Sequence, residues 1–315
     1  MEKLRPWLPL FSILLASFLD IWLPDSSLHT PTKAKYFLWF NIILGIFFTA
    51  GAIRTIFWRN KGKNFITQAP FYAAVIFLLN IFNLVSKKYA LLPVIFFPSL
   101  DRVFSVIVED SFFLASCLAS SAQLLFAGFA IGAAAGILTG IAVGFNKVLS
   151  YWINPLIRAI GPMPPTAWIP IVLVVFPTTF SGSVFLIALS VWFPTTIMTA
   201  GGIQNIPNVY FEVASTLGAG KYYQILKVGI PAAMPQMFLG IFNGAGISFV
   251  TLMTAELLGV KNGIGWYINW QKDMMAYANV YAGLIIIAVS FYLLVMLLFK
   301  VRDRVLVWQK GVIKW

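Results

Sequence analysis

The chain has 315 residues, of which 60% are hydrophobic and only 10% are charged, and its formal net charge is +12. A soluble domain is nearer half apolar and a quarter charged, so this composition excludes an ordinary soluble protein. The apolar residues group into runs of roughly 18 to 25 residues, long enough for a helix to cross about 30 Å of hydrocarbon. Because backbone polar groups in lipid must be satisfied within the protein, the runs predict an all-α polytopic membrane protein.

Eight membrane spans are expected in chain order. They cover about residues 7–24, 36–54, 69–86, 118–145, 153–176, 183–201, 233–258 and 279–299. With the N-terminus inside, most of the basic residues fall on the cytoplasmic side, which the positive-inside rule favours. The positive charge therefore indicates topology rather than nucleic-acid binding. We expect a multi-pass protein of the plasma or inner membrane with both termini cytoplasmic.

The first run follows Lys3 and Arg5, as the apolar segment of a signal peptide would. However, no A-x-A-like cleavage site follows it and Asp20 interrupts it, so an uncleaved span is favoured. The single cysteine, Cys117, cannot form an internal disulfide and gives no information on the redox compartment.

The fourth span contains five glycines at intervals of four residues. They are Gly128, Gly132, Gly136, Gly140 and Gly144. Glycine costs a helix about 1 kcal/mol relative to alanine in water, so five in one span need a reason. Small residues at this spacing let helix backbones approach closely in lipid. The stripe predicts helix packing, either within this chain or between subunits.

The fifth and sixth spans carry features that transport pathways use. The prolines that break the fifth span are Pro162, Pro164, Pro165 and Pro170. Broken helices are tolerated in membranes where they line a cavity or are buried in protein. Trp168 and Trp192 fit either an interfacial aromatic belt or a gate. The hydroxyls of the sixth span either line a polar path or bond carbonyls of their own helix. They belong to Thr195, Thr196 and Thr199.

The expected connection between the sixth and seventh spans contains GAGK, which resembles part of a phosphate-binding loop. The motif G-x-x-x-x-G-K-[ST] requires a glycine where this chain has Ser215 and a small hydroxyl residue where it has Tyr222. No run of β-branched residues precedes it as a strand. A nucleotide site in this segment is therefore excluded.

The same segment predicts a helix, a glycine turn and a second helix. Pro207 and Asn208 signal a helix start, and Gly218 to Gly220 ends or bends that helix. A second short helix is expected near Lys221 and must stop or kink as it approaches Pro231. An ordinary amphipathic connector is the alternative interpretation.

The seventh span contains an acid, Glu256, near its outer end. An intramembrane acid is a functional hypothesis by default, although near an end it can reach interfacial water. Asn243 and Thr251 lie on a loose helical face that suits a hydrated path. No cluster of His, Cys, Asp or Glu has metal-binding spacing, and no catalytic constellation is evident, so neither a metal site nor a catalytic residue is predicted.

Several motifs occur in the order found in one transporter family. The pattern E-x-A-x-x-x-G, followed by aliphatic-x-aliphatic-Pro, occupies Glu212, Ala214, Gly218, Val228, Ile230 and Pro231. It resembles the EAA loop of ABC-importer permeases, with Val213 in place of the family's first alanine. The flanking motifs are PMPPTAWIP (162–170), WFPTTI (192–197), GGIQNIP (201–207), PAAMPQ (231–236) and AELLGVKNGIGWYI (255–268). Together they are similar to the nitrate, sulfonate, taurine and bicarbonate permeases over roughly residues 90–300.

The resemblance implies a type I ABC importer transmembrane domain. It implies a six-helix core at 66–301, an N-terminal extension of two extra helices at 1–65 and a basic cytoplasmic tail at 302–315. The extension could shield the core, contact a partner or aid assembly. The EAA loop, 203–233, would hold a coupling helix that fits a groove of a separate ATPase. The coupling residues implied are Glu212, Ala214, Gly218, Gly220 and Pro231.

The resemblance also implies partners. ATP and magnesium would bind to the ATPase subunits, so this chain would need no cofactor and would not be an enzyme. A substrate-binding protein would dock outside, and a second permease, identical or different, would complete the pathway. The implied substrate is a small anion such as nitrate, bicarbonate, a sulfonate or taurine. The alternatives are a thiamine-precursor-like molecule or, on other grounds, a transporter driven by an ion gradient.

Overall fold

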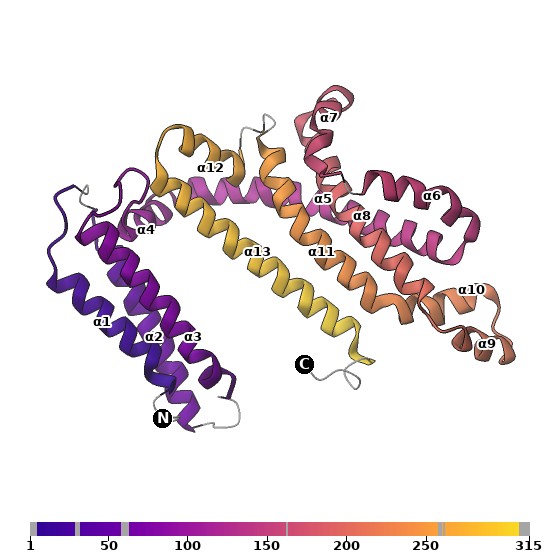
Figure 1. The fold of residues 1–315 in the computed structure, drawn as a ribbon, viewed down its shortest axis with the longest axis horizontal. Coiled ribbons are helices and arrows are strands. Elements are labelled where there is room, and N and C mark those ends of the chain that lie inside the picture. The colour runs from indigo at the N-terminus through magenta and orange to yellow at the C-terminus, as the bar shows by residue number, and fades with distance from the viewer. Residues whose placement is uncertain are drawn as a thin grey trace. The chain divides into compact units, whose positions relative to one another are not determined.

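The structure is a computed structural model that describes residues 5–28, 32–57, 63–161, 163–257, 260 and 262–308. Every regular element in these ranges is helical, which confirms the all-α prediction (Figure 1). The α-helices are α1 (Leu8–Trp22), α2 (Tyr36–Phe57), α3 (Lys63–Asn83), α4 (Leu100–Glu109), α5 (Ser111–Phe145), α6 (Lys147–Ile160), α7 (Ile169–Val175), α8 (Thr179–Gln204), α9 (Asn208–Thr216), α10 (Lys221–Tyr223), α11 (Ile230–Glu256), α12 (Ile264–Asp273) and α13 (Tyr277–Val305).

Six of the described helices are long and apolar enough to cross a membrane. They cover 36–55, 65–88, 111–145, 179–204, 221–256 and 277–305. The pair formed by α6 and the segment 165–175 makes a seventh if it counts as one span, although the two parts are bent by 92°. Length and composition alone therefore identify six or seven of the eight expected spans.

The difference lies in the first and fifth expected spans. The first is α1, whose 15 residues are fewer than the roughly 20 that a full crossing needs. The fifth is broken between Ile160 and Pro165, as its prolines predict, because a proline ring disfavours helical backbone in the preceding residue. Pro162, residues 59–62 of the basic turn and residues 309–315 of the tail lie outside the described ranges.

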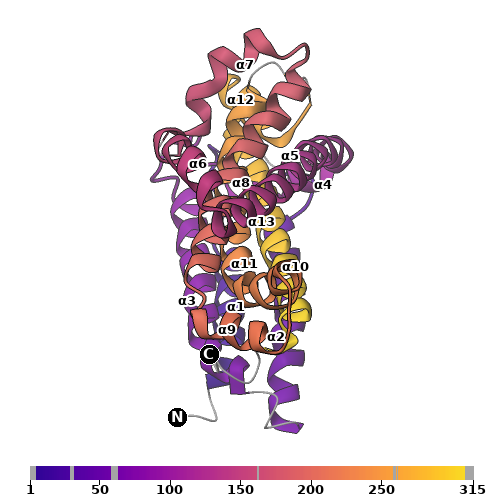
Figure 2. The ribbon, with the colours of Figure 1, turned by 90° about the vertical axis from the view of Figure 1, so that its right-hand side faces the viewer.

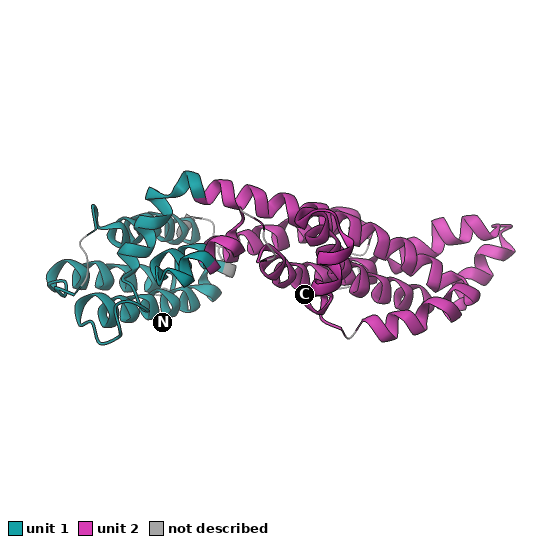
Figure 3. Cartoon of the chain, turned by 90° about the horizontal axis from the view of Figure 1, so that it is seen from above, with its two compact units in different colours: residues 1–113, 270–284 teal, residues 114–269, 285–315 magenta. Residues whose placement is uncertain are grey.

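Contacts divide the chain into two compact units (Figure 3). Unit 1 contains residues 1–113 and 270–284, and unit 2 contains residues 114–269 and 285–315. In unit 1, α1 packs against both α2 and α3. The apolar centre of this three-helix group is formed by Ile13, Phe48 and Ile76.

A buried charge network lies at the end of α3. Lys87 Nζ is 2.5 Å from Asp101 Oδ2 and 3.2 Å from Asp20 Oδ1. Lys88 Nζ is 2.6 Å from Asp25 Oδ1 and 3.4 Å from Asp20 Oδ1. Burial raises the pKa of Asp25, but the hydrogen bond from Lys88 and the two lysine charges outweigh it and lower this pKa below its usual value. The network is therefore a set of mutually dependent charges rather than isolated surface pairs.

The network fixes the direction of the first three helices. Asp20 lies in the last turn of α1 and Lys87 in the π-helical turn that follows α3. The backbone N–H of Phe37, at the start of α2, donates to Asp101 Oδ1 at 2.8 Å. The ends of α1 and α3 therefore meet the beginning of α2, so α1 and α3 run parallel and α2 runs antiparallel to both.

In unit 2 the glycine stripe of α5 lies against α8. A Cβ added to each glycine would come within 2.5–2.9 Å of a Cβ atom on α8. In the order of the five glycines, the facing residues are Ile187, Val191, Thr195, Thr199 and Ile203. Both series advance four residues at a time in the same direction. The two helices are therefore parallel and their backbones touch without intervening side chains.

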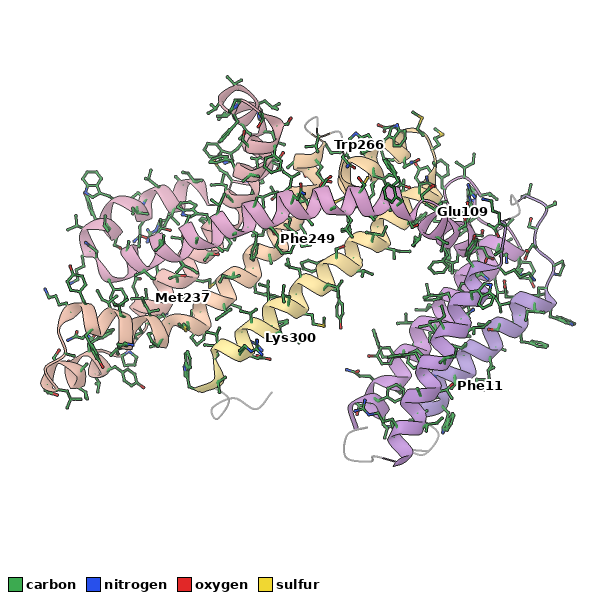
Figure 4. The ribbon with its side chains drawn as sticks, turned by 180° about the vertical axis from the view of Figure 1, so that it is seen from behind. Phe11, Glu109, Met237, Phe249, Trp266 and Lys300 are labelled. Carbon is green, nitrogen blue, oxygen red and sulfur yellow. The ribbon has the colours of Figure 1, made fainter. Side chains whose placement is uncertain are left out.

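A second close contact joins α8 to α11. An added Cβ on Gly240 would lie 2.9 Å from Met198 Cβ, and one on Gly202 would lie 2.7 Å from Gln236 Cβ. Higher numbers on one helix face lower numbers on the other, so α8 and α11 are antiparallel. Phe249 of α11, labelled in Figure 4, packs edge-on against Phe291 of α13 with ring centroids 4.9 Å apart.

The pair of α8 and α11 presents two different ends. Figures 1 and 2 both show α9 and α10 at one end of this pair and α12 near the other. The first end carries the segment predicted to couple to an ATPase. The second carries Glu256.

Candidate functional site: the α9–α10 loop and the polar interior

Helix α9 ends at a glycine whose backbone only glycine adopts readily. Gly218 has φ of +81°. The N–H of Ala219 donates to the carbonyl of Ala214 at 2.9 Å, and the N–H of Gly218 donates to that of Ser215 at 2.9 Å. This pair of bonds is the Schellman pattern, in which a left-handed residue closes a helix. The expected helix and glycine turn are therefore present, and Gly218 is the residue that shapes them.

The second helix of the loop is tied back to the turn. The side-chain amide of Gln224 donates to Ser215 Oγ and to the carbonyl of Ala219, both at 2.8 Å. The helix begins at Lys221 as expected, but it does not stop before Pro231. A π-helical turn, Gln224–Gly229, precedes Pro231, and α11 continues past it. A wider turn is a usual place for a helix to accommodate a break in its hydrogen-bond ladder, which proline imposes.

The loop exposes more apolar surface than a connector needs. Leu217 is 82% exposed, Tyr222 is 84% exposed and Val213 is 53% exposed. A hollow of about 610 Å³ runs along the loop between Tyr210 and Lys227. Nothing lies within 4 Å of a Cβ added to Gly218 or Gly220. The loop is thus a stiff, glycine-faced projection with an apolar groove, and the side chain of Glu212 is exposed on it.

The threonines proposed for a pathway have different surroundings. Thr195 and Thr199 are fully buried beneath Gly136 and Gly140. Thr196 donates to the carbonyl of Trp192 at 2.7 Å, the bond within its own helix that was the alternative prediction. All three contribute to the contact between α5 and α8 in this subunit.

A polar group of α5 that the sequence did not single out joins this contact. The hydroxyl of Thr139 lies 2.8 Å from that of Thr196, and Trp192 Nε1 donates to it at 3.1 Å. Trp168 is half-buried and packs on a cluster that contains Val172 and Leu186. Thr139 belongs to none of the motifs described above, and only its position within the glycine stripe would have suggested it.

The polar residues of α11 do not share one environment. Asn243 is exposed, whereas Thr251 is buried and donates to the carbonyl of Ile247 at 3.0 Å. The loose polar face expected from the spacing therefore contains one accessible polar side chain and one that is satisfied within its helix. A pathway role for Asn243 stays a prediction.

Glu256 is fully buried at the end of α11 and joins three elements. Ser121 of α5 donates to its Oε1 at 2.5 Å, and the N–H of Gly265 donates to its Oε2 at 2.5 Å. Ser121 Oγ in turn accepts the N–H of Ile264 at 2.8 Å. A carboxylate that accepts N–H groups at a helix start also interacts favourably with the helix dipole. Glu256 and Ser121 therefore anchor the start of α12 to α5 and α11.

Two glycines make this anchor possible. A Cβ on Gly263 would lie 2.6 Å from Glu256 Cδ, and one on Gly265 would lie 2.8 Å from its Oε2. The segment NGIG at 262–265 can therefore bring its backbone against the carboxylate. The sequence indicated Glu256 but not Ser121, a single hydroxyl in the small-residue run SSA (120–122). Within the described residues, no group of three or more His, Cys, Asp or Glu side chains is placed to hold a metal.

Comparison with known proteins assigns the family. The profile of the binding-protein-dependent transport system inner membrane component matches residues 132–307, more than half of the chain. The chain belongs to this family. It is a multi-pass, non-catalytic permease component of an ABC transport system, and the resemblance seen in its motifs is confirmed.

Individual permeases are similar to part of this chain. The bicarbonate transport system permease protein CmpB of Synechococcus elongatus is 37% identical over 183 residues, 58% of this chain and 63% of that protein. The nitrate import permease protein NrtB of Leptolyngbya laminosa is 34% identical, covering 53% of this chain and 62% of that protein. The taurine transport system permease protein TauC of Escherichia coli is 28% identical, covering 55% and 63%. The chain spans less than two thirds of the length of these relatives.

Proposed function

We propose that the chain is the permease of an ABC importer whose α9–α10 loop docks on a separate ATPase subunit. The exposed, Schellman-closed projection at the end of α8 and α11 is the observation that carries this proposal. Its apolar groove, exposed Glu212 and open glycines suit a protein partner that approaches closely. Ala214 lines the groove, and Pro231 lies in the first turn of α11. ATP and magnesium would be bound by that partner.

The position of the loop suggests how force would pass. It joins α8 directly to α11, and these helices pack along their length through Gly202 and Gly240. When two ATPase subunits close around bound ATP, they would move both helices together. The pathway would then open first to one side of the membrane and then to the other. A second permease, which we propose to be an identical copy, would complete that pathway. A substrate-binding protein would dock on the opposite membrane face.

The relative directions of the packed helices support a particular count of membrane crossings. Because α5 and α8 are parallel, the segment 146–178 must return the chain across the membrane if both helices cross it. The bent pair of α6 and α7 then counts as a crossing. Helix α1 packs against α2 and α3, both long enough to cross, and runs parallel to α3, which supports a crossing by α1 as well. Its 15 residues and the preceding 3₁₀ turn, Arg5–Trp7, reach about 28 Å, close to the hydrocarbon thickness.

This topology supports eight crossings with both termini on the α9 side, which we propose to be cytoplasmic. It fits a type I importer core at 66–301, with two additional helices before it and a basic tail after residue 301. The membrane would be the plasma or inner membrane. We propose a small anion as substrate, because the similar permeases are named for bicarbonate, nitrate and taurine transport.

Two substitutions in the loop test the proposal. Glu212→Lys reverses an exposed charge, and Gly218→Trp puts a bulky residue at a φ of +81° on the docking face. Each removes a central interface contact, so we expect ATPase binding to weaken by about 2 kcal/mol or more, roughly 30-fold. Transport and ATPase stimulation should fall accordingly in proteoliposomes, while membrane insertion is retained.

Gly246→Ala is the matched control, because Gly246 lies in α11 and an added Cβ there meets nothing within 4 Å. It should bind ATPase and transport as the unmodified chain does. Normal transport by both loop variants would remove the coupling role from this segment.

A further inference from the structure

Helix α6 carries a narrow polar stripe. At 100° per residue, its five polar side chains fall within an arc of about 100°. They are Lys147, Ser150, Tyr151, Asn154 and Arg158. The same five line an open hollow of about 810 Å³ beside the helix, together with Trp152, Pro155 and Leu156 of the same helix.

The remaining faces of α6 are apolar. Outside the hollow, Val148 is 66% exposed and Leu149 is 38% exposed, and Ile157 is the buried residue of this helix. Such faces are suited to lipid or to other membrane helices. A polar stripe on a helix of this kind must face water or a hydrated cavity, because polar and charged groups are costly in hydrocarbon.

The depth of Arg158 makes the stripe informative. Arg158 follows Lys147 by about three helical turns, or about 16 Å along the helix, roughly half of the hydrocarbon thickness. If segment 146–178 crosses the membrane, one of these two bases lies at membrane depth. Figure 1 shows α7 turning away after α6, so the stripe ends where the crossing bends. An ionisable residue at that depth is a functional hypothesis by default.

The chemistry of the stripe favours an anion. Helix α6 has the sequence KVLSYWINPLIRAI and contains no acidic residue. The amide of Asn154 donates to Ser150 Oγ at 2.7 Å, which leaves the second amide hydrogen and the serine hydroxyl hydrogen available as donors. The guanidinium of Arg158 offers a planar fork of N–H groups, which matches the two oxygens of a planar oxyanion.

We propose that this face of α6 is an anion-binding wall of the translocation pathway, where Arg158 and Lys147 attract a small planar oxyanion such as nitrate, bicarbonate or a carboxylate. The inference rests on the proposed importer function, and it assigns the anion to side chains of this chain. Arg158 and Lys147 would then be the basic groups that meet a substrate delivered by the separate binding protein. The stripe is thus expected to be both wet and electropositive.

Charged thiol reagents test both properties without any knowledge of the substrate. The full-length chain is placed in phosphatidylcholine nanodiscs with Cys117→Ala, which removes its single, buried cysteine. Asn154→Cys is then labelled with an anionic and, separately, with a cationic methanethiosulfonate. The anionic rate is divided by the cationic rate, and this ratio is normalised to the same ratio measured for a free thiol in solution. Leu149→Cys, on the face of α6 opposite the stripe and outside the hollow, is the matched control.

We expect Asn154→Cys to react rapidly and Leu149→Cys to react slowly. The anionic reagent should be favoured at Asn154→Cys, and Arg158→Gln should lower that preference by about tenfold because it removes a unit charge nearby. Arg158→Lys should restore it. Labelling of Asn154→Cys no faster than that of Leu149→Cys, or a ratio that Arg158→Gln leaves unchanged, would overturn the proposal.

Two further outcomes are distinguishable. If anionic headgroups cover the stripe, exchange of phosphatidylcholine for phosphatidylglycerol will suppress the labelling, and the pathway assignment is then wrong. Labelling needs no ATPase, so a failure of ATPase docking would leave this result intact. Conversely, normal docking with an unreactive stripe would overturn the anion wall alone.

Discussion

The two compact units hold their helices together by opposite means. In unit 1, Lys87 and Lys88 are buried among three aspartates that come from separate segments. In unit 2, glycines let α5 and α8 touch without side chains between them. A buried charge network fails when one member is removed, because the remaining charges lose their compensation. A glycine contact fails when atoms are added, because packed interiors have no space for them.

The largest effect is expected from a substitution that deletes a charge in unit 1. Lys87→Met keeps the side-chain length and removes the ammonium from Asp101 and Asp20. Asp101 then loses its lysine partner and Asp20 keeps only Lys88, and removing one partner of a buried charge pair costs about 3–5 kcal/mol. The midpoint of thermal unfolding in detergent, followed by fluorescence, should fall accordingly.

Lys33→Met is the control for that variant. Lys33 Nζ lies 3.9 Å from Glu109 Oε2, and its side chain is 82% exposed. A surface pair of this kind contributes about 0–1 kcal/mol. Equal losses from the two lysine variants would show that burial of the network does not matter.

A smaller effect is expected at the buried acid of unit 2. Glu256 is held by hydroxyl and N–H donors, so Glu256→Gln removes a charge without leaving an opposite charge behind. The amide nitrogen would face the N–H of Gly265 or the hydroxyl of Ser121, and loss of charge-assisted bonds costs about 1.5–3 kcal/mol.

Hydrogen exchange shows where that loss acts. Amides at the start of α12 should exchange faster in Glu256→Gln, whereas α9 should be unchanged. Glu109→Gln, at a partly exposed acid that Tyr36 OH contacts at 3.3 Å, should leave α12 unaffected. Unaltered protection of α12 in Glu256→Gln would refute the anchor.

The smallest effect is expected from a substitution that adds only one methyl group to the glycine contact between α5 and α8. An added Cβ on Gly136 would lie 2.6 Å from Thr195 Cβ. Gly136→Ala should therefore separate α5 from α8 and destabilise the chain by about 1–2 kcal/mol, despite the better helix propensity of alanine. Gly246→Ala gains the helix propensity of alanine without a clash, so its midpoint of thermal unfolding should equal or exceed that of the unmodified chain. A stabilising Gly136→Ala would contradict the packing.

The sequence predicted the elements whose signal is local. The glycine interval indicated close packing, and Pro207, Gly218 and Lys221 marked the ends of the loop helices. The partner of the glycine stripe could not be predicted, because a spacing on α5 does not say which helix faces it. Only the structure places Thr195 and Thr199 beneath these glycines, which makes them packing residues within this subunit.

Interactions between distant residues escaped prediction for the same reason. Asp20 was interpreted as an interruption of the first span, since its partner Lys87 is distant in sequence. Ser121 was missed because one hydroxyl in a small-residue run carries no pattern. The stop or kink expected near Pro231 takes the form of a π-helical turn, a backbone adjustment that residue types alone do not specify.

The most direct test of the coupling role is the sidedness of the loop. Tyr222 is 84% exposed, so Tyr222→Cys, combined with Cys117→Ala, gives one accessible thiol at the projection. A membrane-impermeant maleimide should label it in inside-out vesicles and not in intact cells, and bound ATPase subunits should block the reaction. Labelling from the outside of intact cells would contradict the account.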